Sequence, residues 1–87
     1  MANKAWTQQE VLDRLQELNP KPGFAVRELL PGGDETLDYP ASLHMAASQI
    51  AHSQTIYGYK IESIEHGNFL DPERFWNPDQ VQVKMTM

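Results

Sequence analysis

The last seven residues, from Val81 to Met87, alternate apolar and polar side chains without interruption. A period of two is typical of a β-strand with one buried face, because successive side chains of a strand point to opposite sides of a sheet. Chain ends are usually disordered unless a sheet holds them in place. The pattern therefore predicts that this segment is an ordered strand, and that residues 1–87 form a single domain that closes with its final residues.

An amphipathic helix is predicted near the start of the chain. The segment Thr7-Gln8-Gln9-Glu10 has the spacing of a capping box, in which the side chains of Thr7 and Glu10 each accept a hydrogen bond from the backbone amide of the other. One apolar stripe follows, made of Val11, Leu12, Leu15 and Leu18. We expect the helix to end at Asn19-Pro20, because a residue that precedes proline avoids the helical region.

A β-hairpin is predicted next. Residues 24–30 alternate as a strand, and this places Phe24 and Val26 on one face and Arg27 on the other. The segment Pro31-Gly32-Gly33-Asp34 has the composition of a turn, because glycine readily supplies a positive φ. Residues 35–39 either return as a short antiparallel strand, with Leu37 and Tyr39 on the buried side, or form an extended loop.

A second amphipathic helix is predicted after Pro40, with Asp38 or Ser42 as its cap. Its apolar positions recur with helical spacing at Leu43, Ala46, Ala47, Ile50 and Ala51. A third strand is expected over residues 56–64, with Tyr57, Tyr59 and Ile61 on one face. Ile64 is out of phase with that face, which predicts either a β-bulge or a twist near the end of the strand.

Residues 67–80 are irregular, with a short helical turn expected to start at Asp71-Pro72. The complete order is α-β-β-α-β-β, with short connections that favour antiparallel pairing. This order predicts an α+β two-layer sandwich, in which two helices pack on one face of a small, mostly antiparallel sheet of three or four strands.

Composition narrows the classes of function. The net charge is −5 and only seven Lys and Arg residues are present, so direct binding of nucleic acid is disfavoured. The chain has no cysteine, no apolar run of the roughly 18 residues that a membrane span needs, and no apolar leader after Met1. We therefore expect a soluble cytoplasmic protein.

The residues that could carry chemistry are scattered. His44 and His52 are eight positions apart on the predicted second helix, about 12 Å along its axis, which is too far to share one metal ion. Glu65 stands beside His66, but neighbours on a strand point to opposite faces. Nucleophile elbows and phosphate-binding glycine loops are absent. We expect no enzyme, no catalytic residue, no metal site and no cofactor.

Two segments are candidates for contact with a partner protein. Residues 68–78 are rich in aromatic side chains, and the residues proposed to bind there are Phe69, Arg74, Phe75 and Trp76. Closure of the core is the alternative role for Phe69 and Phe75. The second segment is the final strand, where Met85 and Met87 would offer apolar contact if the strand lies at an edge of the sheet. An edge strand would also allow a homodimer.

These observations favour a small non-enzymatic protein-binding module. We expect an inhibitor or regulator, of the kind that phages and mobile elements encode, that blocks a larger macromolecule. An acidic nucleic-acid mimic that occupies a basic groove is one alternative. A small-molecule or metal-binding domain that uses the histidines is the other.

Overall fold

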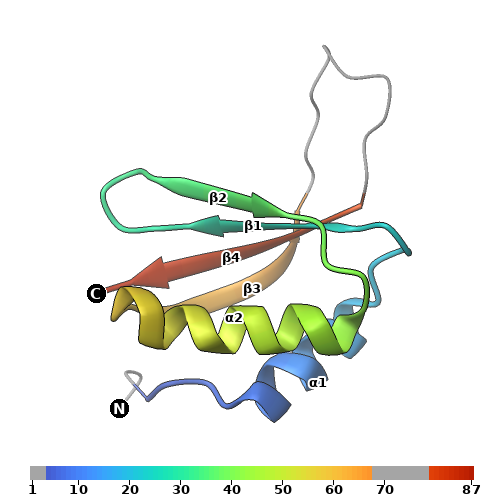
Figure 1. The fold of residues 1–87 in the computed structure, drawn as a ribbon, viewed down its shortest axis with the longest axis horizontal. Helices are drawn as coiled ribbons and strands as arrows, with labels where there is room; N and C mark the ends of the chain where they lie inside the picture. The colour runs from blue at the N-terminus through green and yellow to red at the C-terminus, as the bar shows by residue number, and fades with distance from the viewer. Residues whose placement is uncertain (1–3, 68–78) are drawn as a thin grey trace.

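The computed structural model describes residues 4–67 and 79–87. Its elements follow in the order α1 (Gln8–Leu18), β1 (Ala25–Leu29), β2 (Glu35–Asp38), α2 (Leu43–Tyr57), β3 (Lys60–Gly67) and β4 (Gln80–Thr86). Within these residues four strands form one sheet in the order β2-β1-β4-β3, and both helices lie on the same face of it (Figure 1). The predicted α+β two-layer sandwich is confirmed. The short helical turn predicted at 71–72 lies outside the described residues.

The final strand is an inner strand of the sheet. β4 pairs in parallel with β1 and antiparallel with β3, so both of its edges are occupied. The prediction of an ordered strand at the end of the chain is confirmed, but this strand is not at an edge. Among the described strands the edges are β2 and β3. A homodimer through an edge strand would therefore have to use one of those two.

The first helix begins with the predicted capping box. The Glu10 amide donates to Thr7 Oγ1 at 3.1 Å, and the Thr7 amide donates to Glu10 Oε1 at 2.8 Å. This second bond holds the pKa of Glu10 below its ordinary value. The helix ends at Asn19, which has a left-handed φ of 49°. Asparagine is one of the few residues that adopt this conformation at a helix end.

The hairpin has the predicted turn and the predicted faces of β1, with Phe24 and Val26 towards the core and Arg27 away from it, but not the predicted faces of β2. The Leu30 amide donates to the Asp34 carbonyl at 2.8 Å, and the intervening glycines have positive φ angles. In the resulting register Leu37 lies opposite Arg27, on the face away from the helices, while Thr36 lies opposite Glu28. Residues 35–38 are thus a strand, as one alternative expected, but Leu37 is not on the core face. Tyr39 follows the strand and is exposed.

The second helix is longer than the sequence pattern suggested. Ser42 caps it, with the Met45 amide donating to Ser42 Oγ at 3.1 Å, and it continues to Tyr57 before Gly58 ends it with a φ of 73°. The strand predicted from residue 56 therefore starts only at Lys60. The β-branched and aromatic residues at 55–57 favour a strand locally, but the helix continues until a residue that readily adopts the left-handed conformation.

The bulge predicted in the third strand is present. The register between β3 and β4 shifts between Ile61 and Ser63, which brings Ile61 and Ile64 to the same buried face. Tyr57 and Tyr59 do not share a face of this strand with Ile61, because Tyr57 is the last residue of α2 and Tyr59 precedes β3, where it packs against the core. Their rings stack on each other, with centroids 6.2 Å apart, at the junction between α2 and β3.

The core lies between the helices and the sheet. Its helical members are Val11, Leu12, Leu15, Ala46, Ala47 and Ile50, and its strand members are Val26, Ile61, Ile64, Val81, Val83 and Met85, with Phe24 just before β1. The alanines bring α2 close to its neighbours. Neither helix in the described ranges has the length and apolar character that would let it cross a membrane.

Asp79 joins three parts of the chain at the start of β4. Its Oδ2 accepts a hydrogen bond from the Lys21 amide at 2.8 Å and lies 2.8 Å from His66 Nε2, while its carbonyl accepts from the Ala25 amide at 2.8 Å. Partial burial by itself would raise the pKa of Asp79. The Lys21 and His66 contacts outweigh that effect and place this pKa below its ordinary value.

The lowered pKa of Asp79 predicts an acid-sensitive contribution to stability. A carboxyl whose pKa is lower in the folded state than in the unfolded state stabilises the fold when it is ionised. This stabilisation is lost as the pH falls from the pKa of the unfolded state to that of the folded state. We expect Asp79→Asn to lower the free energy of unfolding by about 1 kcal/mol at neutral pH, and this difference to shrink between about pH 5 and pH 2. Urea titrations across that range measure it. A difference that stayed constant with pH would contradict the assignment.

Candidate functional site

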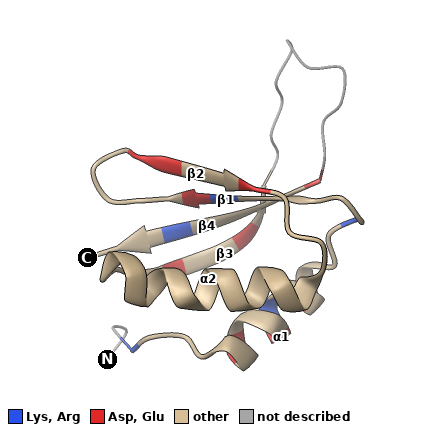
Figure 2. Ribbon diagram, viewed as in Figure 1, with Lys and Arg blue, Asp and Glu red and all other residues tan. Residues whose placement is uncertain are grey.

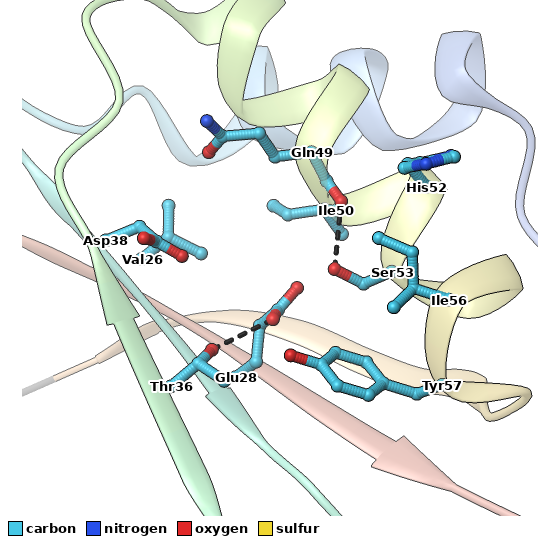
Figure 3. Close-up of a pocket in the computed structure, with 10 residues that line it drawn as sticks. All are labelled: Val26, Glu28, Thr36, Asp38, Gln49, Ile50, His52, Ser53, Ile56 and Tyr57. Carbon is cyan, nitrogen blue, oxygen red and sulfur yellow. Dashed lines mark hydrogen bonds between the residues drawn. The ribbon is translucent and has the colours of Figure 1, made fainter.

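A pocket of about 420 Å³ lies between the β1–β2 hairpin and α2, and we call it the α2–β2 pocket (Figure 3). The sheet contributes Val26, Glu28, Thr36 and Asp38 to its lining. The helix contributes Gln49, Ile50, His52, Ser53, Ile56 and Tyr57.

Glu28 is a buried carboxylate in this pocket, with only 5% of its surface exposed. Val26 faces the core, and the period of two along β1 places Glu28 on the same face. Thr36 Oγ1 donates to Glu28 Oε1 at 2.9 Å, and the other carboxylate oxygen points into the pocket towards α2 (Figure 3). Glu28 forms no ion pair with any other described residue. A cation that entered the pocket would meet a carboxylate without a positive partner.

Charge is distributed very unevenly around the pocket. Helix α2 is 15 residues long and contains no Asp, Glu, Lys or Arg (Figure 2). The charged groups that line the pocket, Glu28 and Asp38, both come from the hairpin and are both acidic. Arg27 lies on the opposite face of the sheet, where it pairs with Glu35. The pocket therefore combines an acidic floor with an uncharged helical wall.

Exposed apolar side chains lie along the same helix. Met45 is 48% exposed, Ile56 is 63% exposed and Tyr57 is 40% exposed. Met45, Gln49, His52 and Ile56 follow one another at intervals of three or four, so they form a single stripe along one side of α2. Three of these four residues also line the pocket. We call these four residues the α2 stripe.

A buried carboxylate without a cation makes the fold less stable than an apolar residue of similar size would. We therefore expect Glu28→Leu to raise the free energy of unfolding by about 1–3 kcal/mol, measured by urea denaturation. Glu62→Leu on edge strand β3 is the control, with an expected change within about 0.5 kcal/mol, because both side chains of its ion pair with Lys84 are exposed. Destabilisation by Glu28→Leu would show that the carboxylate serves the fold itself.

The residues that the sequence singled out for partner contact lie mostly elsewhere. Phe69, Arg74, Phe75 and Trp76 are outside the described residues. Met85 was proposed for partner contact on the condition that its strand lies at an edge, and the structure does not meet this condition: Met85 is 3% exposed and faces the helices from an inner strand. Met87 follows that strand at the end of the chain and is exposed. The described structure does not bring these two methionines to the α2–β2 pocket.

The histidines do not converge. His44 and His52 are exposed on α2, whereas His66 pairs with Asp79. In the described ranges, no three His, Cys, Asp or Glu side chains are grouped closely enough to hold a metal ion. Glu65, which stands beside His66 in the sequence, forms an ion pair with Arg14 at 3.0 Å, and the nearby Glu62 pairs with Lys84 at 3.4 Å.

Sequence reasoning missed the α2–β2 pocket, although two signals of it were present. Glu28 occupies a position in the strand alternation where Phe24 and Val26 predict an apolar residue. The stretch from residue 43 to 57 has no formally charged side chain apart from titratable histidine, which is unusual for a helix with an exposed face. Neither signal is enough to predict a pocket, because the pocket also depends on where the hairpin lies relative to the helix, and this cannot be inferred from the sequence alone.

Comparison with known proteins yields no relative from which a function could be transferred. A scan against models of protein families, a search of curated proteins and a search of solved structures each found no match.

Proposed function

We propose that the protein is a non-enzymatic protein-binding module, and that the partner docks on the α2 stripe and the α2–β2 pocket beside it. The observation that carries this proposal is the uncharged helix α2, which exposes Met45, Ile56 and Tyr57. Cores of protein interfaces are depleted in charged residues and enriched in Met and aromatic residues. A helix face of this composition has no charged group to desolvate when a partner covers it, and its apolar side chains gain contact with that partner.

An inhibitor or regulator that blocks a larger macromolecule is the form of binding that we favour. A small domain that covers a site on a large partner needs an exposed apolar face and no reaction chemistry of its own. A cytoplasmic location belongs to the same proposal, because a chain without cysteine needs no oxidising compartment to fold.

Paired substitutions on α2 test the docking face. We expect Met45→Gln with Ile56→Gln to reduce capture of the partner by roughly tenfold or more, since apolar anchors dominate interface energetics. Ser48→Gln with Thr55→Gln is the matched control, because both residues are exposed on α2 but lie outside the stripe. The measurement is quantitative mass spectrometry of proteins that the immobilised variants retain from a lysate of the native host.

The outcome distinguishes the proposal from the nucleic-acid mimic. If the stripe variants and the control variants retain the partner equally, the α2 stripe is not part of the interface. A partner that duplex DNA displaces, and that the α2 variants still bind, would support the mimic instead. Several described carboxylates already pair with cations of the chain itself, such as Glu17 with Arg14 and Glu62 with Lys84, which weakens the resemblance to a phosphate backbone.

A further inference from the structure

The pocket also indicates the chemistry of the partner. Building on the proposed function, we infer that the α2–β2 pocket accepts a lysine or arginine side chain from an extended segment of the partner protein, and that this segment adds as a strand to the outer edge of β2. Glu28 and Asp38 would hold the cationic group. The α2 stripe would contact the apolar part of the same segment.

The two edges of the sheet differ in their protection. At β3 the Arg14 side chain of α1 donates from Nε to the Ile64 carbonyl at 2.8 Å and pairs with Glu65 at 3.0 Å. A bulge also interrupts that strand between Ile61 and Ser63. Charged side chains and bulges are the usual obstacles to pairing at a strand edge. The structure therefore disfavours strand addition at β3.

Among the described residues, β2 has no bulge and no hydrogen bond from a helix side chain to its backbone, unlike β3. Its own charged side chains, Glu35 and Asp38, are both acidic, so they hinder an acidic strand more than a basic one. β2 pairs with β1 in an unbroken register from Glu35 to Asp38, and no described strand pairs with its other side. Its backbone groups on that side are available to a partner strand, which is a common mode of peptide recognition. Because the side chains of Thr36 and Asp38 line the α2–β2 pocket, a strand added here would direct alternate side chains towards the same pocket.

The geometry selects a long side chain. Neighbouring strands lie about 4.8 Å apart, so a strand added beside β2 would lie about 10 Å from β1, on which Glu28 stands. Only a side chain with an extended stem spans much of this distance. Lysine and arginine have such a stem and place their charge at its end, while the apolar part of the stem can lie along Ile56 and Val26.

Charge complementarity selects the same residues. Thr36 is opposite Glu28 in the register, so Asp38 is a diagonal neighbour of Glu28 on the same face, with the two positions about 7–8 Å apart. A cation between them would interact with both carboxylates. Among the described residues, the hydrogen-bond partner of Glu28 is the neutral Thr36 hydroxyl, so this buried carboxylate has no described cation beside it and would gain from one in the pocket.

A second copy of the chain fits this edge poorly. β2 has two acidic side chains and no basic one. If two β2 strands paired antiparallel about a twofold axis at Thr36, Asp38 of each would face Asp34 of the other. Like charges that lie directly opposite across a strand pair are destabilising. The edge therefore favours a basic partner segment over self-association.

Model peptides test the inference directly. The probe is the acetylated and amidated pentapeptide TVKVT, and the comparison peptide TVQVT has the same strand preference without the charge. Binding is followed by amide chemical shifts of the isotope-labelled protein. We expect shifts at residues 35–38 and around Glu28, and an affinity for TVKVT about fivefold or more above that for TVQVT. Glu28→Gln should remove this preference, whereas Asp13→Asn, which deletes one exposed charge on α1, should preserve it.

Each remaining outcome overturns the inference. Equal affinity for the two peptides would show that the pocket does not bind the lysine side chain specifically. A preference for TVKVT that survives Glu28→Gln would show that Glu28 does not recognise it. Shifts from n-butylamine as large as those from TVKVT, without any change at residues 35–38, would identify a small-amine site without strand addition. These results would leave the capture experiment on Met45 and Ile56 unaffected, so failure of this inference is distinct from failure of the proposed function.

Discussion

Leu15→Ala is expected to lower the free energy of unfolding by about 3–5 kcal/mol. Leu15 is fully buried at the centre of the contact between α1, α2 and the sheet, where neighbours on several elements cannot all move to fill a cavity. A chain of this size has a total stability of roughly 4–13 kcal/mol, so the loss would be a large part of the whole. Urea denaturation followed by circular dichroism measures it.

Leu18→Ala is the matched control for this prediction. Leu18 is on the same helix and only partly buried, so less surface returns to water and the cavity is open to solvent. We expect a loss of about 1–2 kcal/mol. A loss at Leu18 that equalled or exceeded the loss at Leu15 would contradict the assignment of the core centre.

Gln54→Ala is expected to cost about 2–4 kcal/mol, which is large for a polar residue. The Gln54 side chain binds both backbone groups of Trp6, a residue 48 positions away: the Trp6 amide donates to Gln54 Oε1 at 3.0 Å, and Gln54 Nε2 donates to the Trp6 carbonyl at 2.8 Å. Gln54 is itself buried. Removing its amide leaves two partly buried backbone groups without partners, and each such group carries a desolvation cost.

Hydrogen exchange gives this prediction a local readout. The Trp6 amide should exchange slowly in the wild type and much faster in Gln54→Ala, because its acceptor is gone. Gln49→Ala on the exposed side of α2 is the control, with an expected change in stability within about 0.5 kcal/mol. Retained protection of the Trp6 amide in Gln54→Ala would show that the bidentate contact does not hold the segment before α1.

Glu28 connects stability with the proposed function. Two results together would establish this: Glu28→Leu stabilises the fold, and Glu28→Gln removes the preference for a cationic peptide. The carboxylate would then lower the stability of the isolated domain while it contributes to binding. Such a cost is common at binding sites, where groups that await a ligand are unsatisfied in its absence.

Sequence reasoning recovered much of the fold and little of the candidate site. The cap at Thr7 and the turn at 31–34 were predicted, and the cap at Ser42 and the bulge before Ile64 were each one of two alternatives, because such features depend on residues a few positions apart. The end of α2 was misplaced, because Thr-Ile-Tyr favours a strand locally while the helix continues to Gly58. The aromatic residues proposed for partner contact at 69 and 74–76 remain predictions.

The sequence alone determined where helices and strands form, since side-chain periodicity, caps and turn residues act through local sterics and short-range hydrogen bonds. Only the tertiary structure decided that β4 lies inside the sheet beside β1, which buried Met85 and left the edge to β2. The same packing placed Glu28 and Asp38 beneath the uncharged wall of α2. Strand order and pocket position depend on contacts between residues far apart in the chain, and such contacts leave no periodic signal in a single sequence.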